Sequence, residues 1–262
     1  MRTFVGLWRL LRVLVHVLHG MAIVALRFPA LDVQQRQQRI GWWSCGLLRA
    51  IGVQLVVDGE VRAGANLVVA NHVSWLDIPA LHAVCPRARF VSKADVRRWP
   101  LLGWLIGAVG TLFIERERRR DTHRVNRQVA QALEEGDIVA VFPEGTVTDG
   151  TDVLPFKGSL LQPIVDTAGH VQPVAIRYRA HDGAPSTVPA YVEDVTFMGS
   201  LWRICGERAL VVELMALPPV AARQQHRRGL ARRTECAIRA ALALPVHGSA
   251  PDRHVDPAVA SP

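Results

Sequence analysis

Cysteine is scarce in this chain, and its spacing does not suit metal binding. Among 262 residues the only cysteines are Cys45, Cys85, Cys205 and Cys236, and no two of them form a C-x-x-C pair. Structural zinc sites use clustered thiolates or imidazoles, and small secreted domains use frameworks of paired cysteines. The sequence therefore predicts neither a metal site nor a disulfide framework, and free thiols fit a reducing compartment.

Several catalytic motifs are also missing. The chain contains no G-x-S-x-G nucleophile elbow, no H-E-x-x-H pair and no P-loop. Their absence disfavours a serine esterase of the α/β-hydrolase type, a zinc protease and a P-loop nucleotide hydrolase.

Lysine occurs only at positions 93 and 157, so arginine carries almost all of the positive charge. The 31 Lys and Arg residues exceed the 23 Asp and Glu residues, which gives a formal net charge of +8. This balance favours an anionic partner such as lipid head groups, an acidic carrier protein or nucleic acid. Half of the residues are apolar and the mean hydropathy is +0.16, which indicates contact with a membrane.

The N-terminal residues 1–50 form the region that we expect to associate with a membrane. Residues 13–26 contain no Asp, Glu, Lys or Arg, but this run is shorter than the roughly 20 residues of a spanning helix. Two arrangements are open. The helix spans, with Arg2, Arg9 and Arg12 on the cytoplasmic side, or it lies in the interface with its arginines reaching outward. No small-residue cleavage motif follows, which disfavours a secretory signal.

The rest of the chain, residues 51–262, divides into three segments by composition. We expect an α/β domain over residues 51–218, a basic helix over 219–243 and a disordered tail over 244–262. Apolar runs predict strands, and they lie at 53–57, 66–70, 88–92, 111–115, 137–142, 171–178, 191–197 and 209–216. Because an amphipathic helix at 121–136 and other helical patterns alternate with these runs, the fold class is α/β, with a mixed, mostly parallel sheet flanked by helices.

Local signals refine this outline. Asp58-Gly59 predicts a hairpin after the first strand. Residues 31–40 are polar and are typical of a connecting segment, and 41–52 predict a second packed helix. Pro100 marks a helix start, and Pro163 is expected to interrupt a helix over 158–169.

The stretch NHVSWLD, residues 71–77, places polar side chains where a buried strand ends. His72 and Asp77 are five residues apart, so they cannot share a helix face, but a strand-to-helix turn can bring them together. A carboxylate would fix the tautomer of the imidazole, and the free ring nitrogen could then accept a proton. The alternative is structural: Asn71 and Asp77 shape and cap the turn while His72 packs.

Two further stretches carry polar groups at strand ends. FPEGT, residues 142–146, follows a predicted strand, and ligands bind at strand ends in α/β sheets. Five arginines lie at 116, 118, 119, 120 and 124, where a strand gives way to a helix. Most would form a solvated helix face, whereas Arg116 is nearest the strand end and suits an anion.

Together these stretches resemble the lysophospholipid acyltransferase family. The matching blocks, in order, are Asn71 to Asp77 (NH-x4-D), Gly110 to Arg116, Phe142 to Thr146 and Gln172 to Ile176. The resemblance covers roughly residues 50 to 215, and its specificity comes from four blocks in the right order. It departs at Val147-Thr148, where Arg-Ser is common in the family, and at Glu115, where Asp is frequent.

The resemblance implies the chemistry of the site. His72 would be the general base on an acceptor hydroxyl, and Asp77 would orient it. The residues expected to hold a phosphate-bearing acceptor are Arg116, Glu144, Gly145, Thr146, Lys93 and Lys157. The co-substrate would be an acyl thioester of coenzyme A or acyl carrier protein, with no resident cofactor and no metal.

The resemblance also implies partners and a location. The expected acceptor is 1-acylglycerol-3-phosphate, giving phosphatidic acid, and the altered third block leaves lyso-ornithine lipid or another lysolipid as the alternative. We expect a membrane partner, no nucleic acid, and a place on the cytoplasmic face of the inner membrane. Two other classes remain: a basic membrane- or nucleic-acid-binding module and a lipid esterase. Thiol release that depends on a lysolipid acceptor would separate them from an acyltransferase.

Overall fold

The computed structural model describes residues 2–94, 96, 102–114, 119–192 and 195–245. Its helices are α1 (Arg2–Leu26), α2 (Val33–Ile51), α3 (Asp77–Val84), α4 (Leu102–Ala108), α5 (Arg119–Glu134), α6 (Gln162–Asp166), α7 (Phe197–Gly206) and α8 (Arg227–Ala241), with 3-10 turns η1 (Phe28–Ala30) and η3 (Gly158–Leu161). Its strands are β1 (Val53–Asp58), β2 (Asn66–Ala70), β3 (Ala88–Lys93), β4 (Leu112–Ile114), β5 (Ile138–Val141), β6 (His170–Ala180), β7 (Leu210–Ala216) and β8 (Val220–Ala221).

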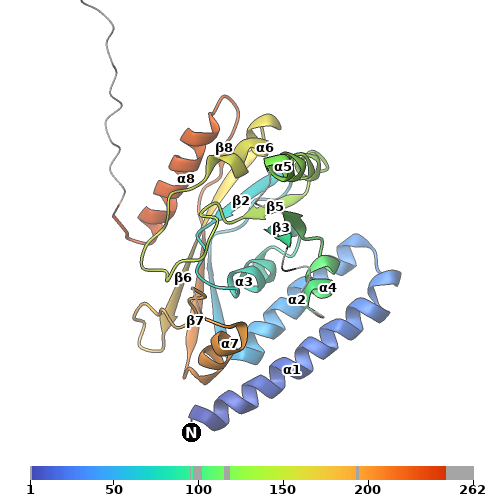
Figure 1. The fold of residues 1–262 in the computed structure, drawn as a ribbon, viewed down its shortest axis with the longest axis vertical. Coiled ribbons are helices and arrows are strands. Elements are labelled where there is room, and N and C mark those ends of the chain that lie inside the picture. Colours follow the sequence, from blue (N-terminus) through green and yellow to red (C-terminus); the bar gives the residue numbers. More distant parts are fainter. Residues whose placement is uncertain (1, 95, 97–101, 115–118, 193–194, 246–262) are drawn as a thin grey trace, which may run out of the picture.

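These strands form one sheet in the order β1-β7-β6-β2-β5-β3-β4, and β8 pairs with β6 (Figure 1). The pairs of β6 with β7 and of β6 with β8 are antiparallel, and the others are parallel. The central strand β2 lies between β5 and β6, and all five of its residues are buried. The expected mixed, mostly parallel sheet flanked by helices is confirmed.

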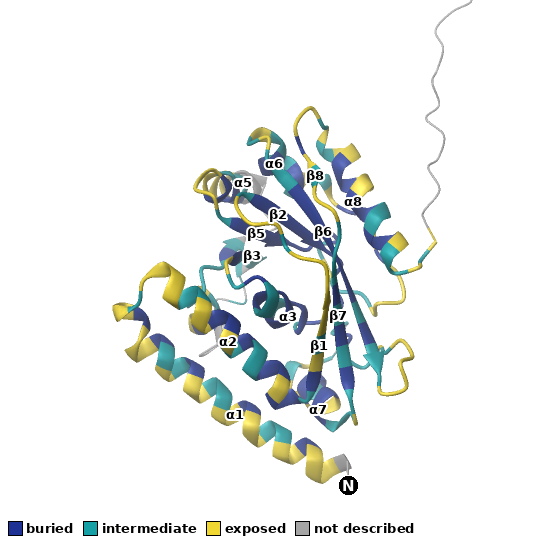
Figure 2. Cartoon of the chain, turned by 180° about the vertical axis from the view of Figure 1, so that it is seen from behind, coloured by how far each residue is buried: buried dark blue, intermediate teal, exposed yellow. Residues whose placement is uncertain are grey.

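Each face of the sheet has its own apolar core, because successive strand residues point to opposite faces. Val68 and Ala70 of β2 face the core that includes residues of α1, α2, α3 and α7. Leu67 and Val69 face the core that includes residues of α5, α6 and α8. The first face also carries the N-terminal helices, which lie side by side along the domain (Figures 1 and 2).

Helices α1 and α2 form an antiparallel pair. The Trp43 indole donates to the carbonyl of His16 at 3.1 Å, and the His16 ring lies 2.8 Å from the carbonyl of Trp43. A side chain at Gly20 would collide with the Trp43 ring, so this glycine allows the close approach of the two helices. The pair is therefore held by specific contacts in addition to apolar packing.

The start of α2 corrects one expectation. Residues 31–40 are not a connecting segment, because Asp32 and Gln35 form a capping box and α2 starts at Val33. This box satisfies two of the backbone N–H groups that a helix start leaves free. The second packed helix predicted at 41–52 is present as the C-terminal part of α2, which ends at Gly52 with φ of +90°.

Three other local predictions are wrong. No hairpin forms at Asp58-Gly59: β1 pairs in parallel with β7, and the chain crosses to β2 in the middle of the sheet. Residues 191, 192, 195 and 196 are not in a strand, and Phe197 already belongs to α7, which Thr196 caps. Pro163 lies in the first turn of α6, which starts at Gln162, and does not interrupt a helix, since its missing N–H costs nothing in a first turn.

The predicted amphipathic helix at 121–136 is present as α5. The basic helix predicted over 219–243 is present as α8 but starts only at Arg227, because residues 220–221 form β8 beside β6. Residues 246–262, 97–101 and 115–118 lie outside the described residues. The disordered tail and the helix start at Pro100 therefore stay predictions.

Candidate active site

The turn between β2 and α3 carries the NHVSWLD stretch. Asn71 extends the sheet through its side chain, which accepts from the Ile176 N–H at 2.8 Å and donates to the Ile176 carbonyl at 2.9 Å. The chain then turns, and Asp77 becomes the first residue of α3. The end of a central strand is thereby fixed to its neighbour just before His72.

His72 and Asp77 meet as the sequence predicts. The distance from His72 Nδ1 to Asp77 Oδ2 is 2.8 Å, and the Asp77 side chain is fully buried. The same oxygen accepts the N–H groups of Val73 at 2.8 Å and Ser74 at 2.9 Å. A carboxylate held by three donors cannot rotate freely, so it fixes both the turn and the orientation of the imidazole.

The second oxygen of Asp77 has a partner that the sequence does not predict. The Tyr178 hydroxyl, from β6, donates to Asp77 Oδ1 at 2.6 Å. Burial and the neighbouring Asp77 charge raise the pKa of Tyr178 well above its ordinary value, so this phenol stays protonated and donates. Tyr178 lies 101 positions after Asp77 in the chain, and only the pairing of β6 beside β2 brings it to this carboxylate.

The His72 ring is oriented by packing as well. It stacks on Phe142 with ring centroids 3.9 Å apart and an interplanar angle of 11°. Its Nε2 has no hydrogen bond among the described residues, and 19% of the side chain is exposed. One ring nitrogen is therefore engaged by Asp77, and the other remains available to a substrate.

The FPEGT turn supports His72 from the next strand. Glu144 is buried, and its two oxygens accept the N–H groups of His72 at 2.7 Å and Leu154 at 2.8 Å. Burial raises the pKa of Glu144 to about 7. Glu144 does not line the cavity beside His72, so its contacts make it a brace for two loops and do not support direct contact with the acceptor.

The remaining predicted site residues fall into three groups. Gly145, with φ of +79°, and Thr146 line the cavity beside His72. Lys157 is exposed and does not line that cavity, although its N–H donates to the carbonyl of Pro143. Lys93 ends β3, with its backbone paired to Ile114 of β4, and Arg116 lies outside the described residues.

Ser74 is not placed as a nucleophile. Its side chain is fully buried, and its Oγ accepts the N–H of Leu76 at 3.3 Å. Thr148, where the sequence departs from the family pattern after the third block, stabilises the same turn: its N–H donates to the His72 carbonyl at 2.8 Å. The backbone on both sides of the His72 ring is thus tied down by neighbouring loops.

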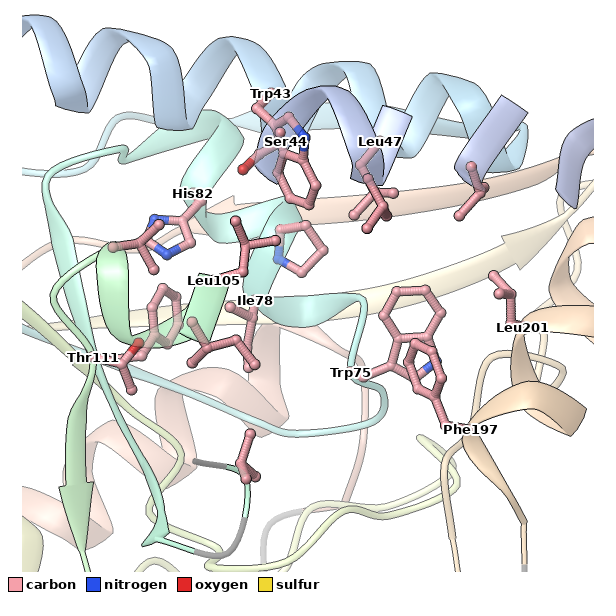
Figure 3. A pocket seen from close by; sticks show the side chains of 18 of the residues that line it. Trp43, Ser44, Leu47, Trp75, Ile78, His82, Leu105, Thr111, Phe197 and Leu201 are labelled. Carbon is pink, nitrogen blue, oxygen red and sulfur yellow. The ribbon is translucent and has the colours of Figure 1, made fainter. Parts of the chain in front are cut away.

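His72 lines a cavity of about 1380 Å³ between the domain and the N-terminal helices. Figure 3 shows other side chains of its lining. Its lining is mostly apolar and comes from α1, α2, α3, α4 and α7; examples are Leu10, Val17, Trp43, Leu47, Ile78, Leu105 and Leu201. Arg39 is the one Lys, Arg, Asp or Glu in the lining contributed by the described residues. A cavity of this size and character suits hydrocarbon chains.

Comparison with known proteins agrees with this geometry. The Acyltransferase family profile matches residues 54–177. A lyso-ornithine lipid O-acyltransferase of Pseudomonas aeruginosa is 40% identical over 218 residues, which cover 82% of this chain and 83% of the relative. The chain belongs to the acyltransferase family.

Other relatives of this acyltransferase bear a second name. A 1-acyl-sn-glycerol-3-phosphate acyltransferase of Neisseria meningitidis is 38% identical over 201 residues, covering 76% of this chain and 78% of the relative. The crystal structure of the 1-acyl-sn-glycerophosphate acyltransferase of Thermotoga maritima matches with a TM-score of 0.71 at 22% identity, covering 93% of this chain and 97% of that one. This last likeness establishes the shared fold.

Proposed function

We propose that this acyltransferase transfers an acyl chain from a thioester, on coenzyme A or acyl carrier protein, to the free hydroxyl of a lysolipid. The observation that supports this most is His72, which is held by a buried carboxylate at one nitrogen and opens at the other into a large apolar cavity. The names of the relatives support a lysolipid acceptor.

The proposed reaction needs no covalent enzyme intermediate. Nε2 of His72 takes the proton of the acceptor hydroxyl, and that oxygen attacks the thioester carbonyl carbon. As the tetrahedral intermediate collapses, the C–S bond breaks and the thiolate receives the proton from His72. Asp77 keeps the other proton on Nδ1 and stabilises the imidazolium between the two steps.

The oxyanion of the intermediate needs hydrogen-bond donors. The N–H groups of His72, Val73 and Ser74 already donate to carboxylates, so the first turn has little to offer. We assign this role to the backbone N–H groups of Thr146 and Val147, since both residues line the cavity.

The preferred acceptor in this proposal is 1-acylglycerol-3-phosphate, giving phosphatidic acid, with Arg116, Lys93, Gly145 and Thr146 as the phosphate contacts. Lyso-ornithine lipid is the second candidate, because the relative with 40% identity bears that name. The two acceptors differ in chemistry at the head group, since only the first carries a phosphate.

An assay of thiol release across both acceptors and both donors tests the proposal. Thiol release that requires a lysolipid, together with formation of the diacylated product, is the expected result. Release of free fatty acid without an acceptor would indicate an esterase, and binding of lipid without release would indicate a binding module. A matched reaction with His72→Ala controls for spontaneous thioester hydrolysis.

We also propose that α1 lies in the interface of the cytoplasmic face of the inner membrane. By length and composition α1 could span a membrane, but one side packs on the domain and Arg9 donates to the carbonyls of Cys205 and Glu207. The other side exposes large apolar side chains: Phe4, Leu7, Trp8, Leu11, Leu14, Val15 and Leu18 (Figure 2).

Flotation with anionic vesicles tests this arrangement. Trp8→Gln combined with Leu11→Gln should reduce the bound fraction, because apolar area leaves the interface. Val57→Gln combined with Leu154→Gln removes exposed apolar groups outside α1 and should not. Equal binding of both double variants would contradict the assignment.

A further inference from the structure

A second histidine lies inside the cavity, away from the catalytic pair. His82 is on α3, one turn beyond Ile78, and both side chains line the cavity (Figure 3). Only 5% of His82 is exposed. Its ring packs edge-on against Phe90, with centroids 4.7 Å apart.

Neither ring nitrogen of His82 has a hydrogen-bond partner among the described residues. The buried side chains Asp77 and Asn71, in the turn between β2 and α3, are satisfied by contrast: Asp77 has four donors and Asn71 binds both backbone groups of Ile176. Burial lowers the pKa of His82 to about 4, so the ring is neutral at physiological pH, with one donor and one acceptor nitrogen. Buried polar groups without partners are rare in folded proteins and call for an explanation.

The position of His82 restricts what it can contact. A row of rings leads from His72 to Phe142, then to Phe90, then to His82, with centroid separations of 3.9, 6.1 and 4.7 Å. All four rings line the same cavity. In an acyltransferase the reacting carbonyl must be beside His72, so His82 meets a part of the ligand that lies several carbons further along a chain.

We propose that His82 recognises an oxygen-bearing acyl chain, through a hydrogen bond to a hydroxyl group placed several carbons from the carboxyl carbon. A hydroxyl both donates and accepts, so it can pair with either nitrogen of a neutral imidazole. The Ser44 hydroxyl, on α2, lines the same cavity and is a second polar group for such a chain. This inference rests on the proposed acyl transfer; the chain is either the one transferred or the one that the acceptor already carries.

Two series of substrates test the inference. In the first, lysophosphatidic acid receives chains from palmitoyl-coenzyme A donors that each carry one hydroxyl, placed successively further from the thioester. In the second, palmitoyl-coenzyme A is the donor and the hydroxyl moves along the chain of the acceptor. One series should show a single preferred position, with kcat/KM roughly three- to tenfold above its neighbours. The series that shows it identifies which chain contacts His82.

His82→Phe keeps a ring of similar shape and removes both nitrogens. In this variant kcat/KM at the previously preferred position should fall to that of the neighbouring positions, a loss of roughly three- to tenfold relative to the wild-type protein. Ile78→Leu, one turn away in the same cavity, changes shape without changing polarity and should keep the preference. A flat series in the wild-type protein with both substrates, or a preference that survives His82→Phe, would overturn the inference.

A binding measurement keeps the inference independent of turnover. Hydroxylated and plain palmitic acids compete with a fluorescent fatty acid for the cavity, and the wild-type protein should prefer one hydroxylated isomer. Absence of any transfer of plain chains would refute the proposed function alone. Equal competition by all isomers would refute the role of His82 and leave the proposed function standing. This comparison uses only the wild-type protein, so it does not depend on whether a variant folds.

Discussion

His72 and His82 lie ten positions apart and line the same cavity, yet their surroundings are opposite. His72 is partly exposed, and its Nδ1 is held by Asp77. His82 is buried, and its nitrogens have no partner within the described residues. A histidine becomes a base when a polar scaffold fixes one nitrogen and leaves the other open, whereas an unpartnered histidine in an apolar wall can recognise a ligand without taking its proton.

The largest contrast is expected from removing each ring in turn. His72→Ala removes the base and should lower kcat by about 10²- to 10⁴-fold, whereas His82→Phe keeps the base and should remove only the roughly three- to tenfold preference for one hydroxylated chain. Steady-state kinetics on the two variants, with thermal midpoints measured alongside, make the comparison. An active but destabilised His72→Ala protein would make His72 a packing residue. Ser74→Ala, also in the turn, should keep most of its activity.

Asp77→Asn brings His72 closer to the situation of His82, since the imidazole loses its charged partner. We expect kcat to fall by about 10²-fold or more because the amide favours the wrong tautomer. The double variant with His72→Ala should be scarcely worse than His72→Ala alone, because the two residues act as one unit. Multiplicative losses would argue against a unit. Thermal midpoints are also expected to fall, since Asp77 accepts four hydrogen bonds.

Glu144 gives a pH-dependent test of the scaffold around His72. The pKa of Glu144 is about 7 in the folded protein and 4.5 as its ordinary value. The unfolded chain therefore loses this proton at a lower pH than the folded protein, so the free energy of unfolding falls as the pH rises from about 4.5 to about 7. The loss is at most about 3 kcal/mol. Glu144→Gln should flatten this part of the pH profile in urea titrations. An unchanged profile in the variant would mean that another group titrates.

The smallest effect is expected at Tyr178. Tyr178→Phe removes the hydroxyl that donates to Asp77 Oδ1 and leaves the three other donors in place. A hydrogen bond to a charged group contributes about 1.5–3 kcal/mol, so we expect a lower thermal midpoint and a loss of kcat smaller than that of Asp77→Asn. Activity equal to wild type with reduced stability would show that Tyr178 supports the turn alone.

The sequence predicted this site where its residues are close together in the chain. His72 and Asp77 share one short stretch, so their meeting at a turn could be inferred from spacing. Tyr178 and the bracing role of Glu144 could not, because both depend on which strands are neighbours of β2. That order is set by tertiary packing of several equally apolar strands.

The fold class followed from alternating strand and helix patterns, but two junctions did not. Asp58-Gly59 has the composition of a hairpin turn, although the partner of β1 is β7, more than 150 positions away. Residues 191–197 have the apolar character of a strand, yet Thr196 caps a helix there. Local composition does not distinguish these cases, because the deciding contacts come from distant segments.

The order of the strands has a consequence for synthesis of the chain. β2 has β5 and β6 as neighbours, and the acceptors of Arg9 lie at the end of α7, so the N-terminal half is made before its partners exist. At roughly 5–20 residues per second, about 10–40 s separate the emergence of α1 from that of α7. During that interval the long apolar helix α1 leaves the ribosome without the surface that later covers one of its sides.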